Sequence, residues 1–350
     1  MQPAPFAVRV VPVVAALLAI PRLSAAQAPP GDRVAVRFDT AEAAAALQLV
    51  EARRAGRPVT EAGWQRLFAT DGYRRLQTRE AAVQRDFTDA DFRVFIASDT
   101  LGARAAELRR TLAGWQRADV TAAAARALAY LPADARIHAT VYVMIKPRTN
   151  SFVWDVRTDP AIFLYLDPAM TAAQLENTVA HELHHIGFAS IAGSTDSVLL
   201  TLPDGVRPAA EWLGAFGEGV AMLAAAGGPD VHPHTASAAP DKARWDRDVA
   251  NFNDDLRKVE RFFLDVIGGR LAGDSIRTVA AEFYGVQGPW YTVGWKMAAT
   301  VERGFGRPAL LECLRDPRLL LARYNAAAGD SLARWSPALL AAFGADEVGR

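Results

Sequence analysis

The segment from Val179 to His185 reads VAHELHH and constrains this chain more than any other stretch. It contains one H-E-x-x-H pattern, formed by His181, Glu182 and His185. On an α-helix, residues four apart lie about 40° apart around the axis and one turn apart along it. Two imidazoles at that spacing can converge on one tetrahedral zinc ion, with Glu182 beside them as a base for a water molecule. The pattern therefore predicts a catalytic zinc site on a helix.

His184 is the additional histidine of this segment. It points roughly 60° to the other side of His181, so we expect it to make a supporting or surface contact and not a metal bond. The chain has six histidines, and three of them fall within residues 181–185. Such clustering favours a metal site over an ordinary polar helix face.

The flanking sequence predicts an α+β, predominantly helical fold with a small antiparallel or mixed sheet beside the H-E-x-x-H helix. Residues 40–131 carry apolar side chains at helical spacing. The β-branched run Ile137–Ile145 and the short run Ile162–Leu166 predict strands. Thr171 and Gln174 then form a capping box for a helix that reaches about Phe188.

Other local signals predict where elements end. Asp71-Gly72 is typical of a turn, and a polar loop containing Leu199 and Leu200 is expected after the H-E-x-x-H helix. The next helix should begin near Pro208 and continue to Gly227.

A catalytic zinc needs a third protein ligand. Glu218 is the best candidate, because Gly217 and Gly219 flank it in an otherwise apolar helix and would permit close approach to another helix. Glu211 lies on the same helical face about two turns earlier and is the alternative. By residue type, three histidines are also candidates, namely His138, His232 and His234.

The HELHH segment followed by Glu218-Gly219-Val220-Ala221 resembles the gluzincin metallopeptidases. The mature chain as a whole resembles uncharacterised bacterial proteins grouped as zinc-dependent peptidases, through the stretches IKPRTNSFV at 145–153, IFLYLDP at 162–168 and NTVAHELHHIG at 177–187. The resemblance implies that His181, His185 and Glu218 bind zinc and that Glu182 is the general base. Met222 stands where thermolysin-like enzymes have an aspartate, and the chain has no G-x-M-E-N segment for a substrate amine. Exopeptidase specificity is therefore not carried over.

Gluzincins also use a Tyr or His from a later helix to stabilise the oxyanion of the reaction. Here Tyr291 stands at a helix entrance marked by Gly288-Pro289, with Tyr284 as the alternative. We further expect either the Ile137–Ile145 strand or the Asn150-Ser151 segment to pair with an extended substrate.

The N-terminus predicts export. Arg9 precedes an apolar run, and Ser24 and Ala26 occupy the −3 and −1 places of a signal-peptidase site. We expect three parts: a signal peptide over 1–26, a helical N-terminal region over 27–135, and the zinc-peptidase catalytic region over 136–350. The mature protein would be periplasmic or secreted, with no stable membrane insertion.

The composition limits the partners. The 39 basic and 39 acidic residues balance, which argues against nucleic acid as a main partner. The one cysteine, Cys313, lies in a helical apolar pattern typical of a buried small residue. The predicted activity is cleavage of a peptide or protein substrate. Two alternatives remain open: an exported binding protein without catalysis that keeps this fold, and a zinc hydrolase of other amides or esters.

Overall fold

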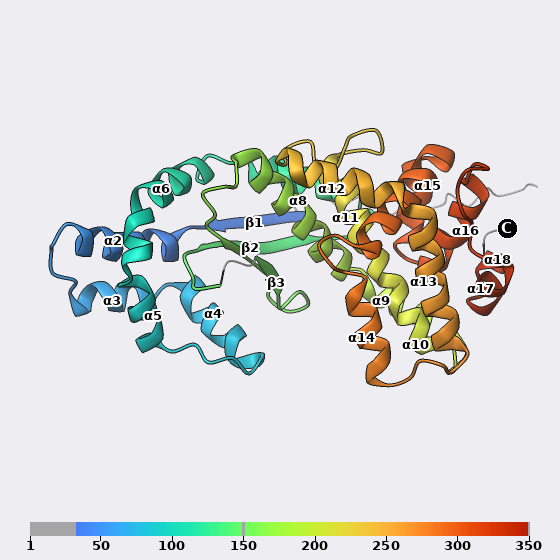
Figure 1. The fold of residues 1–350 in the computed structure, drawn as a ribbon, viewed down its shortest axis with the longest axis horizontal. Helices are drawn as coiled ribbons and strands as arrows, with labels where there is room; N and C mark the ends of the chain where they lie inside the picture. Colours follow the sequence, from blue (N-terminus) through green and yellow to red (C-terminus); the bar gives the residue numbers. More distant parts are fainter. Residues whose placement is uncertain (1–32, 149–150, 349–350) are drawn as a thin grey trace, which may run out of the picture.

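The computed structural model describes residues 33–148 and 151–348. The predicted signal peptide and Asn150 lie outside these residues. The molecule is elongated, with the sheet and the N-terminal helices towards one end and the C-terminal helices at the other (Figure 1). Helix α8, Ala172–Ala189, lies between the two and carries the H-E-x-x-H segment.

The sheet is small and mixed, as the sequence indicated. Its strands are β1 (Val34–Asp39), β2 (Ile137–Met144), β3 (Phe152–Trp154) and β4 (Ala161–Tyr165), in the order β1-β2-β4-β3. Strand β2 pairs in parallel with both β1 and β4, whereas β3 is antiparallel to β4. Since β1 comes from the region expected to be helical, the proposed N-terminal and catalytic regions share one sheet.

Six helices follow β1, as the spacing of apolar residues predicted. They are α2 (Ala41–Arg54), α3 (Glu61–Phe68), α4 (Asp71–Ala82), α5 (Asp89–Ile96), α6 (Asp99–Trp115) and α7 (Val120–Leu128). The prediction of a turn at Asp71-Gly72 is wrong, because these two residues are the first residues of α4. The Thr70 side chain caps that helix by accepting from the Tyr73 N–H, and Asp71 suits the positive end of the helix dipole.

Helix α8 is fixed at both ends. The predicted capping box is present, with Thr171 accepting from the Gln174 backbone and the Gln174 side chain accepting from Thr171. Its apolar side chains belong to the main core together with those of one sheet face. At Gly187 a Cβ would stand 2.2 Å from Leu131, so the helix packs closely against its neighbours. The other side of α8 carries His181 and His185.

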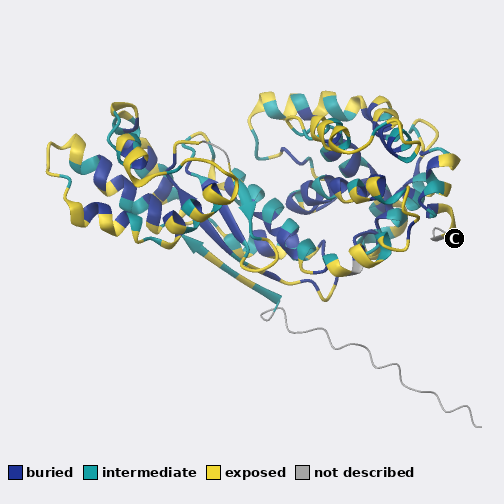
Figure 2. Ribbon diagram, turned by 90° about the horizontal axis from the view of Figure 1, so that it is seen from below, coloured by how far each residue is buried: buried dark blue, intermediate teal, exposed yellow. Residues whose placement is uncertain are grey.

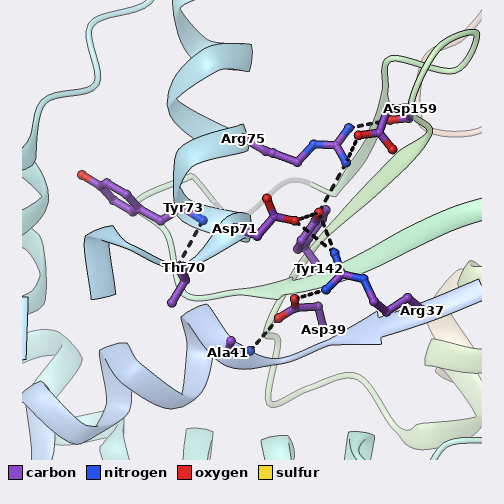
Figure 3. A network of polar contacts seen from close by, with 9 residues as sticks. All are labelled: Arg37, Asp39, Ala41, Thr70, Asp71, Tyr73, Arg75, Tyr142 and Asp159. Carbon is purple, nitrogen blue, oxygen red and sulfur yellow. Dashed lines mark hydrogen bonds and ion pairs between the residues drawn. The ribbon is translucent and has the colours of Figure 1, made fainter. Parts of the chain in front are cut away.

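The other sheet face is covered in part by α4. A second, smaller core there contains Leu76, Tyr142 and Phe163. Figure 3 shows the polar border of this contact: the Tyr142 hydroxyl donates to Asp71 and accepts from Arg37 at 3.2 Å. These contacts join β1, β2 and α4.

The C-terminal half is entirely helical in the described residues. Its elements are α9 (Ala192–Leu199), α10 (Arg207–Ala210), the 3-10 helix η1 (Glu211–Phe216), α11 (Gly217–Ala226), α12 (Ala239–Ala250), α13 (Phe252–Ile267), α14 (Asp274–Glu282), α15 (Pro289–Cys313), α16 (Pro317–Ala327), α17 (Pro337–Ala342) and α18 (Ala345–Val348). Figure 2 shows dark, buried ribbon in the interior of this helical half. Cys313 is buried, as its pattern predicted. No helix in the described ranges has the length and apolarity that a bilayer crossing requires.

Two element predictions in this half need correction. The loop expected around Leu199 is instead the end of α9, which is anchored because the buried Thr195 hydroxyl donates to the Leu314 carbonyl. The single helix expected from Pro208 to Gly227 is interrupted by η1. Pro208 does lie in the first turn of α10, and Gly227 ends α11 in the left-handed conformation.

Helices α11 and α15 cross in direct backbone contact at two glycines. A Cβ on Gly219 would stand 1.9 Å from the Trp295 nitrogen, and one on Gly294 would stand 2.6 Å from the Phe216 oxygen. A Cβ on Gly217 would meet no atom within 4 Å, so this glycine takes no part in the crossing. The close approach expected beside Glu218 is therefore confirmed, and Gly219 alone of the flanking pair makes it.

Candidate metal centre

Three side chains from two helices converge at the middle of the molecule. Nε2 of His181 and Nε2 of His185 lie 3.0 Å apart, and each lies 3.2 Å from Oε2 of Glu218. Among the described residues these three form the group of potential metal-binding side chains. Helix α8 supplies the histidines one turn apart, and α11, which packs against both α8 and α15, supplies the carboxylate.

This donor set fits a zinc ion. Ligands about 2.1 Å from a tetrahedral zinc stand roughly 3.4 Å from one another, close to the observed triangle. Two imidazole nitrogens and one carboxylate oxygen are also a donor combination that zinc prefers. The three side chains are partly exposed, with His181 at 13%, His185 at 25% and Glu218 at 19%. One side of the triangle is thus open for a further ligand.

The electrostatics of Glu218 suit a metal ligand. Burial would raise the pKa of this carboxyl, but the two histidines outweigh burial and hold the pKa well below its usual range. The carboxylate is therefore ionised and available as a donor throughout the physiological range.

Glu182 lies beside this triangle and faces a cleft. The cleft has a volume of about 290 Å³ and is lined by His181, Glu182 and Tyr291 among others. Its wall along the first half of α8 consists of neutral polar side chains, namely Gln174, Asn177 and Thr178. The cleft therefore adjoins the metal-binding triangle at His181 and places Glu182 beside it.

The structure also brings Tyr291 to the centre. Its ring stacks on His181, with the ring centroids 6.2 Å apart and the planes 14° apart. Burial and then the neighbouring Glu218 carboxylate raise the pKa of Tyr291, so the phenol remains protonated and can donate a hydrogen bond. Tyr284 packs behind it, with ring centroids 6.5 Å apart.

The other predicted candidates lie elsewhere. Glu211 is exposed and lies in η1. Because this segment is a 3-10 helix, Glu211 and Glu218 do not share the helical face that a continuous α-helix would give them. His138 lies on β2 in the sheet, and His232 pairs with Asp246 at 2.8 Å. His234 lines the cleft without joining the metal-binding triangle.

His184 is a buried supporting residue. Its Nε2 lies 3.2 Å from the Tyr130 carbonyl oxygen, and burial lowers its pKa to about 3. A neutral imidazole that donates to this carbonyl links α8 to the end of the N-terminal helices, as expected for a histidine outside the metal site.

The structure bears differently on the two segments that were predicted to pair with a substrate. The strand predicted at Ile137–Ile145 has hydrogen-bonded neighbours on both sides, β1 and β4. The prediction that this strand pairs with a substrate is therefore wrong. The alternative segment is only partly described, at Ser151. It leads into β3, the strand at the edge of the sheet.

Sequence reasoning missed two residues of the cleft. Ser237 from the loop before α12 and Gln287 from the turn before α15 line it, together with His234, which the sequence had offered only as a possible metal ligand. Their residue types and spacing carry no motif. Only the packing of α12 and α15 brings the two loops together.

The chain matches one protein-family model. Residues 64–331 match the family model described as "Putative zinc dependent peptidase (DUF5700)", and the chain belongs to this family. Its cofactor is accordingly Zn²⁺. No curated protein and no solved structure matches the chain.

Proposed function

We propose that this chain is an exported zinc metallopeptidase with a gluzincin-type centre. The observation that carries the proposal is the convergence of His181, His185 and Glu218 beside a cleft that Glu182 and Tyr291 also line. In this assignment the two histidines and Glu218 hold the zinc. When bound, zinc supplies Lewis-acid polarisation and a lowered pKa for water.

The chain's own residues would then perform the proton transfers. The Glu182 carboxylate accepts a proton from the water that attacks the substrate carbonyl, and passes it to the leaving amine nitrogen. The Tyr291 hydroxyl donates a hydrogen bond to the oxygen that gains negative charge. The neutral α8 wall of the cleft orients the peptide through hydrogen bonds.

Further parts of the proposal concern export and the substrate edge. Cleavage after Ala26 would release a mature chain beginning at Gln27 into the periplasm or medium. The N-terminal sequence of the protein recovered from that compartment tests this step. The segment entering β3 from Ser151 is the proposed edge for an extended substrate, since β4 occupies only one side of β3.

The test of catalysis compares three variants with the wild type. Metal content is measured together with hydrolysis of a mixed peptide pool and of small amide and ester substrates. We expect about one zinc per chain in the wild type and in Glu182→Gln, with peptide hydrolysis reduced at least 1,000-fold in Glu182→Gln. Glu218→Ala should lose zinc, whereas Glu211→Ala should keep both zinc and activity.

Each alternative activity has its own outcome. Full peptide hydrolysis by zinc-loaded Glu182→Gln would falsify the proposed base. Turnover of esters or small amides with no peptide cleavage would instead identify a non-peptide hydrolase. Zinc binding with no turnover of any substrate would favour a binding protein.

A further inference from the structure

One residue in the cleft wall opposite α8 has an unfavourable backbone conformation. Gln287 has φ +62, in the left-handed region that non-glycine residues rarely occupy. It lies in the turn from Tyr284 to Gly288, which is closed by a hydrogen bond from the Gly288 nitrogen to the Tyr284 oxygen at 2.7 Å. Glycine is the residue that this conformation accepts without steric cost. A glutamine here therefore costs stability, and such positions cluster at functional sites.

The Gln287 side chain lines the same cleft as His181, Glu182 and Tyr291. The turn that carries it leads directly into α15, so its position is fixed relative to Tyr291. A glycine in this turn would remove the strain but would leave the wall without a side chain. The residue with the strained backbone therefore carries a side chain that lines the cleft beside His181.

The Gln287 side chain has three polar neighbours, namely Arg244, Met222 and His234. The amide oxygen accepts from Arg244 at 3.5 Å and the amide nitrogen donates to the Met222 sulfur at 3.9 Å. Both contacts are at the limit of hydrogen bonding, well beyond the 2.9 Å typical of a strong N–H···O bond. A substrate amide at normal hydrogen-bonding distance would replace these two long contacts at little cost. His234 also interacts with the Gln287 side chain, and its Nδ1 lies 2.9 Å from the Ser237 hydroxyl.

A primary amide offers one acceptor and two donors on a flat group. The complementary partner is another amide, because a peptide unit presents one N–H and one C=O. The facing α8 wall, with Gln174, Asn177 and Thr178, is likewise polar and uncharged. The cleft walls on both sides of the centre therefore match the neutral backbone of a peptide.

We propose that Gln287 is a substrate-binding residue whose amide hydrogen-bonds a backbone peptide unit of a peptide substrate. This inference rests on the proposed peptidase function. In this proposal the Gln287 side chain contributes to substrate binding, and the left-handed backbone of the same residue lowers the stability of the fold.

The test uses Gln287→Gly, with Gln84→Gly as a matched control. Gln84 also has positive φ, at +54, but is exposed at the end of α4 and outside the cleft. Both glycine variants should match or exceed the wild type in Tm, because both relieve the same backbone strain. Gln287→Asn, which tolerates left-handed backbone but is one methylene shorter, separates loss of the amide's reach from any change in the turn.

The kinetics are measured with the peptide of the mixed pool that the wild type cleaves fastest. We expect Gln287→Gly and Gln287→Asn to raise KM about tenfold, with kcat within about threefold of wild type and zinc content unchanged. Gln84→Gly should keep wild-type KM. A purely structural role would instead lower Tm or change kcat and zinc content.

Two results would overturn the inference in distinguishable ways. If the wild type cleaves peptides and both Gln287 variants keep KM within twofold, the binding role is refuted while the peptidase proposal stands. If the zinc-loaded wild type cleaves no peptide, the proposed function fails and this inference fails with it.

Discussion

Replacing Gly219 by alanine is the sharpest test of how the centre is assembled. A Cβ at this position would lie 1.9 Å from the Trp295 nitrogen and 2.2 Å from the Gly294 carbonyl carbon. Ordinary contacts of this kind are about 3.5 Å, so α11 and α15 would have to separate by more than 1 Å. Both obstructing atoms belong to the backbone, which cannot rotate away. We expect a loss of about 3 kcal/mol or more in the free energy of unfolding.

The same displacement would reach the metal site, because Glu218 is the adjacent residue on α11. A ligand moved by about 1 Å no longer completes a tetrahedral zinc site, whose ligand distances vary by only about 0.2 Å. Gly219→Ala should therefore bind zinc at least tenfold more weakly than the wild type. The measurements are urea unfolding with and without zinc, and zinc affinity by competition with a chromophoric chelator.

The matched control is Gly217→Ala, two residues away on the same helix. No atom lies within 4 Å of its added Cβ, so alanine should leave zinc affinity unchanged and stabilise the helix by up to about 1 kcal/mol. If the two alanine variants agree within about 0.5 kcal/mol in stability and within twofold in zinc affinity, the account of the helix crossing is refuted.

Three further variants test other contacts. Burial raises the pKa of Glu42 to about 8, and its carboxyl accepts from the Ile145 N–H at 2.8 Å. The folded state thus retains a proton that the unfolded chain releases near pH 4.5, so this group's contribution to stability falls as pH rises from about 4.5 to 8. In urea titrations, the stability of Glu42→Gln relative to wild type should rise across that window, and a constant difference would contradict this sign. His184→Ala should cost about 2–4 kcal/mol, through the cavity and the lost contact with the Tyr130 carbonyl, while keeping one zinc per chain by metal analysis. Tyr291→Phe should lower kcat by about 10- to 1,000-fold at unchanged zinc content, and wild-type kcat would exclude it as the oxyanion donor.

Local sequence alone was sufficient for the helix that carries the histidines. Thr171 and Gln174 specify its start through a capping box, and the four-residue spacing of His181 and His185 places both rings on one face. Both features act within two helical turns, where backbone geometry is nearly invariant. The β-branched run at Ile137 predicted its strand for the same reason.

The edges of the sheet and the interruption of the helix before Glu218 could not be predicted in this way. Strand β1 is defined by its pairing with β2, about 100 residues later, and β3 has only three residues. The 3-10 helix at Glu211 likewise carries no clear local signal. Such elements depend on distant partners, whose contacts outweigh local propensity.

The amino-acid sequence determined which groups could bind zinc and indicated Glu218 through its flanking glycines. Tertiary structure decided that Gly219 is the glycine in contact, that Glu211 lies outside the metal-binding triangle, and that Gln287 lines the cleft. The physical reason is that ligand chemistry belongs to individual side chains. Convergence instead depends on how α8, α11 and α15 pack, and that packing is the outcome of many contacts between residues far apart in the chain.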